Sequence, residues 1–99
     1  MPGFVQIMEI KTSRFEELKA FFEKMEAERG DTLLATRSTF TADRDRPGYY
    51  LAIIEFNSYE EAMKNSNSAS TNEVVAQMRT FFDEPPKYHN LDVVHTFER

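Results

Sequence analysis

The chain has 99 residues, enough for one domain built around a single apolar core. Seventeen acidic against twelve basic residues give a net charge of -5, which opposes binding to nucleic acid and to anionic membrane surfaces. Nine Phe and four Tyr indicate a large buried area, and the lack of cysteine excludes disulfides, thiolate catalysis and Cys-based zinc sites. We therefore predict a single folded domain over residues 1–99.

Targeting and membrane-spanning segments are not expected from the sequence. The apolar run near the N-terminus is too short for a signal peptide and is interrupted by Glu9. No later stretch approaches the roughly 20 apolar residues that a membrane-spanning helix needs. We expect a cytoplasmic protein with no membrane partner.

The first third of the sequence predicts a strand followed by a helix. Residues 4–10, FVQIMEI, are apolar and β-branched and too few for a helix, so they favour a strand. Ser13 precedes Glu16 by three residues, which is the spacing of a capping box, and Gly30 is placed to end the helix in the left-handed conformation. The apolar residues between these ends recur at spacings of three and four: Phe15, Leu18, Phe21, Phe22 and Met25.

A β-hairpin is predicted next. Residues 33–42, LLATRSTFTA, have strand-like composition, and the following segment 43–48, DRDRPG, has Pro and Gly where turns favour them. Residues 49–56, YYLAIIEF, form the longest apolar run in the chain. A run of this kind suits a central strand that is covered on both faces.

Two further helices are predicted from capping boxes. Ser58 with Glu61, and Ser70 with Glu73, have the spacing of residues that cap a helix start. The second of these helices has an apolar face and is stopped by two prolines; the residues concerned are Val74, Val75, Met78, Phe81, Phe82, Pro85 and Pro86.

The segment 65–73, NSNSASTNE, lies between these two helices. Ser, Thr and Asn side chains compete with helical hydrogen bonds, so the segment is interpreted as a polar connection with caps or, alternatively, as the rim of a pocket. After it, the alternating segment 88–97, YHNLDVVHTF, predicts a last strand.

The order of elements, β-α-β-β-α-α-β, is that of a ferredoxin-like split βαβ sandwich of the α+β class. Right-handed crossovers favour a four-stranded antiparallel sheet in the order 4-1-3-2 with the helices on one face. Because the strands are apolar on both faces, the other face of the sheet is left bare and apolar. We therefore predict a homodimer that packs through the sheet face.

The chain resembles the dimeric α+β barrel superfamily, in particular the antibiotic-biosynthesis monooxygenase-like group. The resemblance rests on FVQIMEI followed by SRFEELKAFFEKM, then YYLAIIEFNSYEEAMKNSNSAS and FFDEPPKYHNLDVV, which together span nearly the whole chain. It implies a pocket between the sheet and the helices of each protomer, and oxidation of phenolic or quinol substrates with no metal and no other cofactor. Asn65 stands roughly where many of these proteins have a His, and the Trp that monooxygenase members tend to use is absent here.

Cofactor-free oxygenation needs a site that holds a phenol, favours its anion and excludes water. Arg37 is a candidate to stabilise a phenolate, and His89 and His95 are candidate general bases. On one strand the two histidines would lie roughly 20 Å apart, too far to share a metal ion, and no metal-binding motif occurs. The candidate ligand-binding residues are Tyr49, Tyr50, Asn65, Ser66 and Asn67.

Each candidate also has a structural interpretation. Arg37 could form a surface ion pair, either histidine could be a structural hydrogen-bond donor, and the two tyrosines could serve packing alone.

Three classes of function stay open. The first is a cofactor-independent monooxygenase, or a small-metabolite isomerase, that uses the pocket between sheet and helices. The second is a non-catalytic ligand-binding or partner protein with the same fold. The third is an RNA-binding module with the same element order, but the net charge opposes it, and Tyr50 and Leu51 stand where that motif requires a small residue and an aromatic.

Overall fold

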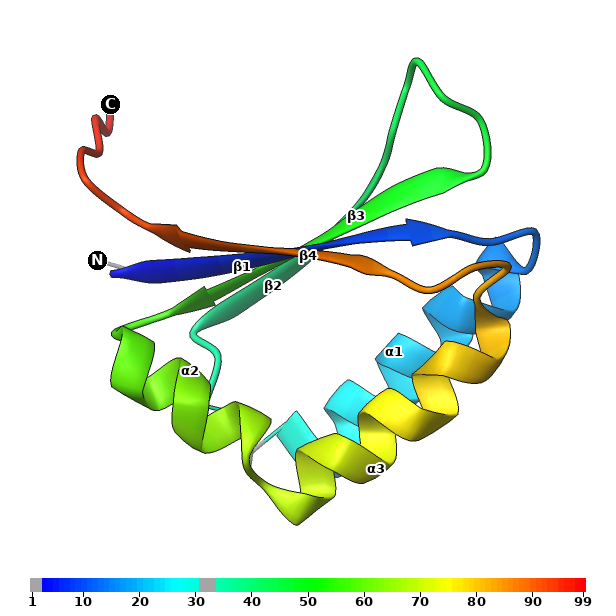
Figure 1. Ribbon diagram of the computed structural model, residues 1–99, viewed down its shortest axis with the longest axis horizontal. Coiled ribbons are helices and arrows are strands. Elements are labelled where there is room, and N and C mark those ends of the chain that lie inside the picture. Colours follow the sequence, from blue (N-terminus) through cyan, green and yellow to red (C-terminus); the bar gives the residue numbers. More distant parts are fainter. Residues whose placement is uncertain (1–2, 31–33) are drawn as a thin grey trace.

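The computed structural model describes residues 3–30 and 34–99. Along this part of the chain the elements are β1 (Phe4–Lys11), α1 (Phe15–Arg29), β2 (Arg37–Ala42), β3 (Tyr49–Phe56), α2 (Tyr59–Ser66), α3 (Ala69–Met78), η2 (Arg79–Phe81) and β4 (Lys87–Asp92). The strands form an antiparallel sheet in the order β2-β3-β1-β4. The helices of the described part lie together on one side of it (Figure 1). The predicted α+β ferredoxin-like fold and strand order are therefore confirmed.

The two faces of the sheet have different neighbours. In β1, Met8 and Ile10 are buried and pack with Leu18 of α1 and Met78 of α3, so the even-numbered residues of this strand face the helices. The odd-numbered residues lie on the other side, which we call the open face. From the register, the residues on the open face include Val5, Ile7, Glu9, Lys11, Arg37, Tyr49, Leu51, Ile53, Glu55, His89 and Leu91.

An aromatic stack fixes α1 against the outer half of the sheet. The ring of Phe15 lies 4.6 Å from the ring of Tyr50 and 5.7 Å from that of Phe40, centroid to centroid, and both pairs are nearly parallel. Phe22, two turns further along α1, meets Phe40 edge to face at 5.0 Å. Such pairs stabilise the packing beyond the area that they bury. The stack therefore holds α1 at a set distance over β2 and β3.

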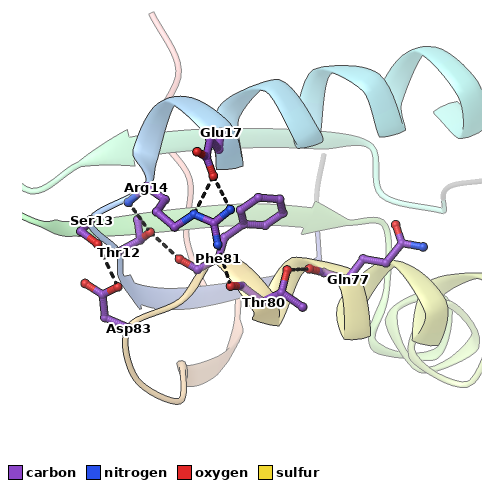
Figure 2. A network of polar contacts seen from close by, with 8 residues as sticks. All are labelled: Thr12, Ser13, Arg14, Glu17, Gln77, Thr80, Phe81 and Asp83. Atoms are coloured by element: carbon purple, nitrogen blue, oxygen red, sulfur yellow. Dashed lines mark hydrogen bonds and ion pairs between the residues drawn. The ribbon is translucent and has the colours of Figure 1, made fainter.

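A network of polar contacts ties the β1–α1 junction to the end of η2 (Figure 2). Thr12 is buried, and its Oγ1 donates to the carbonyl oxygen of Phe81 at 2.5 Å and accepts from the backbone N–H of Arg14 at 2.9 Å. The Arg14 guanidinium lies 4.9 Å from the centre of the Phe81 ring and forms an ion pair with Glu17. The backbone N–H of Asp83 donates to Lys11 at 2.8 Å, so two distant parts of the chain are joined here.

The β2–β3 loop rises on the side of the sheet away from the helices (Figure 1). Arg46 in this loop donates to Glu9 Oε1 and to Asp43 Oδ2, each at 2.8 Å, and lies 4.4 Å from the ring centre of Tyr49. Gly48 has a φ of 90°, the left-handed conformation that glycine adopts without steric cost. The predicted hairpin turn is confirmed, and the hydrogen bond from Arg46 to Glu9 joins it to the open face.

The predicted capping box at the start of α1 is wrong. The N-cap residue is Arg14, with no side-chain cap hydrogen bond, and the Ser13 hydroxyl donates to Asp83 Oδ1 at 3.2 Å. Ser13 therefore makes a tertiary contact with the segment after η2, and its hydroxyl does not cap the backbone N–H of Glu16. Gly30 is also not left-handed: its φ of -53° and ψ of -38° continue the helix, and its N–H donates to Glu26.

The capping prediction holds at α2 and fails at α3. Ser58 Oγ accepts from the backbone N–H of Glu61 at 3.1 Å, as its spacing predicts. The start of α3 was placed at Ser70 by its spacing from Glu73, but Ser68 is the N-cap residue and accepts from the N–H of Thr71 at 3.3 Å. In a segment with several Ser residues, the one whose backbone is extended takes the cap, and Ser68 has that conformation.

The outer strands are shorter than the sequence predicts. β4 ends at Asp92 because Asp92 pairs with Phe4, the first residue of β1, and one further bond from the Val93 N–H to Gly3 closes the ladder. His95 therefore lies beyond the strand, and the prediction that both histidines lie on one strand is wrong. β2 begins at Arg37, and the part of the prediction that falls on residue 33 lies outside the described residues.

Candidate functional site

A cavity of about 380 Å³ lies between the sheet and the helices. We call it the sheet–helix cavity. Its walls come from all four strands and from α1, α2 and α3. A volume of this size is within the range of small-molecule sites in proteins.

Most of the cavity wall is apolar. Phe22 and Met25 of α1, Met78 of α3 and Met8 of β1 all line it. Ala52 lies in the middle of β3, where its short side chain leaves space above the sheet. Methionine is flexible and polarisable, so a wall with three of them can adapt to an aromatic ligand.

One end of the cavity is polar and neutral. Asn65 and Ser66, the last residues of α2, line it together with Ser68, Thr71 and Asn72 at the start of α3. Polar side chains also shape the local fold here, because they can bond the free backbone groups at a helix end and the Ser68 hydroxyl caps α3 in this way. The junction of two helices thus brings amides and hydroxyls to one end of a mostly apolar cavity.

Two polar residues at the β1–β4 side of the cavity were not singled out from the sequence. Gln6 and Tyr88 both line the cavity, and Gln6 Nε2 donates to Asn90 Oδ1 at 3.1 Å. The signal was present in β1, where the helix-facing series is Phe4, Gln6, Met8 and Ile10. Gln6 is the polar exception in that series, and a polar residue on an apolar face indicates a functional position.

Asn65 and Ser66 are the sequence-predicted ligand residues that lie in the cavity wall. Asn67 follows them as the C-cap residue of α2, and it is not among the described residues of the wall. The rim interpretation of this segment therefore applies to its first two residues.

The two predicted tyrosines point to opposite faces of the sheet. Tyr50 faces the helices and is part of the aromatic stack with Phe15 and Phe40, outside the cavity wall. Tyr49 is on the open face, beside Arg46 and with Lys11 5.7 Å from its ring centre. Their predicted contact with a ligand stays a prediction.

The three predicted catalytic residues are not brought together. Arg37 is on the open face with its Nε 3.7 Å from Glu55 Oε2, and its side chain is 75% exposed. His89 is on the open face of β4 and exposed, and His95 is exposed beyond the end of that strand. None of the three is a described residue of the cavity wall, so their catalytic roles stay predictions.

The charged groups with a displaced pKa lie away from the cavity. Hydrogen bonds from Arg46 hold the pKa of Glu9 and that of Asp43 below their usual values, and both carboxylates raise the pKa of Arg46. Among the described residues of the cavity wall, Glu26 of α1 is the charged one. The electrostatics of the cavity are therefore those of neutral hydrogen-bonding groups with one carboxylate in the wall.

Within 3–30 and 34–99 no group of three or more His, Asp or Glu side chains is placed to hold a metal ion. No helix in these ranges has the length and apolar character required to cross a membrane.

No protein-family model matches the chain, and no curated protein matches its sequence. Solved structures do match it. SnoaB, a cofactor-independent oxygenase from Streptomyces nogalater, matches with a TM-score of 0.80 and 11% sequence identity over 100% of both chains. The chain shares its fold.

Two further structures support the same conclusion. An antibiotic biosynthesis monooxygenase matches with a TM-score of 0.71 and 11% identity, covering 93% of this chain and 99% of that chain. A conserved protein from Methanosarcina mazei Go1 matches with a TM-score of 0.78 and 8% identity over 93% of each chain. The resemblance to antibiotic-biosynthesis monooxygenase-like proteins is confirmed at the level of the fold, and these identities carry it no further.

Proposed function

We propose that this protein binds a small phenolic or quinol-like molecule in the sheet–helix cavity and promotes its oxidation by dioxygen without a metal or an organic cofactor. The observation that carries the proposal is the composition of the cavity: an apolar wall that fits aromatic rings, with neutral amides and hydroxyls at one end. The similarity of fold to SnoaB, a cofactor-independent oxygenase, supports it.

The chemistry requires that the substrate itself reduce dioxygen. In the simplest balanced reaction, a ring CH₂ group in a tautomer of a phenol becomes a carbonyl. One atom of dioxygen enters the product, the other leaves as water with the two hydrogens, and the substrate supplies all four electrons. A protein aids this reaction by holding the phenol, stabilising its anion and excluding water.

The residues of the cavity are suited to binding and positioning. Asn65 and Ser66 can donate to or accept from a ligand oxygen, whereas an amide such as Asn65 is no base at physiological pH. Met8, Phe22 and Met78 can cover the ring faces and keep water out. The proposed function therefore uses orientation and exclusion of water as its main contributions.

We also propose that a second copy of the chain packs against the open face. Val5, Ile7 and Ile53 are apolar and only half-buried in the single chain, and Leu91 is 44% exposed. A bare apolar sheet in one protomer is stabilised when a second protomer covers it. The proposed assembly is a homodimer through the open face, with one sheet–helix cavity in each protomer.

Dioxygen uptake tests the proposed activity. Purified protein, treated with a chelator, is mixed with a panel of phenols and quinols and with haem, while an oxygen electrode and mass spectrometry follow consumption and product. We expect accelerated uptake with at least one phenol or quinol and a product that is heavier by one oxygen and lighter by two hydrogens. Binding with no uptake would favour the non-catalytic ligand-binding alternative, and a product of unchanged mass would favour an isomerase.

A further inference from the structure

We infer that Gln6, held in place by Asn90, is a specificity-determining residue of the sheet–helix cavity that accepts a hydrogen bond from a protonated hydroxyl group of the ligand, distinct from the hydroxyl that ionises in the proposed oxidation. The inference rests on the proposed function, because it concerns the ligand of the same cavity. It assigns a role to Gln6 and names a ligand hydroxyl as the group that Gln6 binds, and neither follows from the composition of the cavity alone.

The position of Gln6 in the sheet is unusual for its chemistry. It lies in β1, a central strand, with Ile54 of β3 opposite on one side and Asn90 of β4 opposite on the other. Phe4 and Met8, two residues away on the same face, are each only 4% exposed. Gln6 itself is half-buried, so a ligand that fills the cavity would remove its amide from water, and the polar atoms of the amide would then need partners. A ligand in the cavity is one source of such a partner.

Asn90 fixes the direction of the Gln6 amide. Gln6 Nε2 donates to Asn90 Oδ1 at 3.1 Å, which uses the NH₂ end of the amide toward β4. Gln6 Oε1 has no hydrogen bond to any residue in the described part of the chain, and Gln6 lines the cavity. An amide oriented in this way presents an acceptor, so it selects a ligand that carries a donor.

The rest of this wall favours a hydroxyl on an aromatic ring. Met8 and Ala52 line the cavity beside Gln6 and give an apolar floor on which a flat ring can lie. Tyr88 of β4, which pairs with Met8 across the sheet, also lines the cavity. A phenolic O–H bonded to Gln6 Oε1 would place the ring over this floor, and an unsubstituted ring would leave Oε1 without a partner.

Matched ligands test the inference directly. We would measure the binding of 1-naphthol and of naphthalene, which share the ring system and differ in the hydroxyl, to wild type and to Gln6→Leu. We expect Gln6→Leu to weaken 1-naphthol binding on the order of tenfold and to leave naphthalene binding unchanged or stronger. Gln77→Leu replaces the chain's other glutamine, on the exterior of α3, and should change neither affinity.

The role of Asn90 is separated from a structural one by two variants. Asn90→Leu removes the acceptor for Gln6 Nε2 and should lower the preference for 1-naphthol over naphthalene. Asn90→Asp keeps an acceptor oxygen at that place and should restore the preference. Both variants change the same surface position, so a difference between them reports on the acceptor oxygen. A thermal unfolding scan of each variant shows whether it is folded.

The outcomes are distinguishable. If wild type binds both compounds and Gln6→Leu leaves their affinity ratio unchanged, the inference about Gln6 is wrong while the ligand site stands. If Asn90→Leu leaves the ratio unchanged, the positioning role of Asn90 is wrong. If wild type binds neither compound, the proposed ligand site fails, and the inference fails with it.

Discussion

Thr12 shows how much one residue contributes where two segments meet. It is 2% exposed, and its hydroxyl both donates to Phe81 and accepts from the N–H of Arg14 (Figure 2). A buried hydroxyl with both functions satisfied stabilises the fold, whereas removal of the hydroxyl leaves two backbone groups without a partner. The closure of the domain at this end therefore depends on a residue that no sequence pattern marked.

Replacement of Thr12 by Val tests this contribution. The two side chains have similar shape, so the change removes the hydrogen bonds and keeps the packing. We expect Thr12→Val to lower the free energy of unfolding by about 1 to 3 kcal/mol in a denaturant titration. Thr96→Val, at an exposed position beyond β4, should leave it within experimental error. Equal stability of the two variants would show that the network contributes nothing.

Ser68 provides a second test at the scale of one residue. Its Oγ accepts from the N–H of Thr71, an N–H at the helix start that has no intrahelical partner. We expect Ser68→Ala to destabilise the protein by about 1 kcal/mol, and Ser68→Asn, which can still cap, to recover most of that loss. A loss of the same size in both variants would contradict the capping role.

Among the elements, the β2–β3 loop depends most on electrostatics. Arg46 bridges Glu9 of β1 and Asp43 at the start of the loop, so it joins the loop to the open face of the sheet. Its hydrogen bonds lower the pKa of both carboxylates below their ordinary values of 4.5 and 3.8. Because the folded pKa values are lowered, this stabilisation is present above the ordinary values and is lost as the pH falls through the lowered ones.

The pH dependence of unfolding tests whether this stabilisation is lost as the pH falls. We expect wild type to lose stability as the pH falls below about 4.5, and Arg46→Met to lose less over the same range, because its carboxylates have no bridging cation. Arg44→Met removes the same charge from an exposed position in the same loop and should follow the wild-type slope. Parallel slopes for wild type and Arg46→Met would contradict the bridge.

The elements also show what the sequence can and cannot predict. Hydrophobic runs and turn residues were sufficient for the strand order and the hairpin, because these features depend on local pattern and on the handedness of crossovers. The end of β4 was not predictable, since it is set by where its partner β1 begins and not by the alternation that continues to Phe97. For the same reason Ser13 was misassigned, because its partner Asp83 is 70 residues away.

The candidate site was predictable only in part. Asn65 and Ser66 were found because a polar break between two helices is visible in the sequence. Arg37 and His89 were chosen for their chemistry, but strand parity places them on the open face, and that parity depends on which face the helices cover. Gln6 was missed because one polar residue in an apolar strand has meaning only once its face is known.

The whole molecule has one apolar sheet face that the helices do not cover, and we propose that a second protomer covers it. The helices cover one face of the sheet (Figure 1). The other face has apolar residues in its two central strands. A stable interface of standard size buries about 800 Å² on each partner. Dimerisation through that face leaves the sheet–helix cavity on the far side of each protomer.

Light scattering tests the dimer. We expect wild type to have twice the mass of one chain at micromolar concentration, and Ile7→Lys, in the middle of the open face, to shift it to the monomer. The reason is that a lysine ammonium buried in an apolar interface has no partner. Ala20→Lys, at an exposed position on α1, should stay dimeric. A wild-type mass of one chain would contradict the proposed assembly.

A variant that fills the sheet–helix cavity tests whether the proposed cofactor-free oxidation takes place there. Ala52 lines its floor, so Ala52→Phe should occupy the space where the ring of a substrate would lie, while Ala20→Phe changes only the exposed side of α1. We would measure dioxygen uptake by chelator-treated wild type and both variants with the most reactive phenol or quinol of the panel. We expect accelerated uptake by wild type and Ala20→Phe, and uptake at the uncatalysed rate by folded Ala52→Phe. Uptake by Ala52→Phe at the wild-type rate, or no acceleration by wild type with any compound, would contradict the proposal.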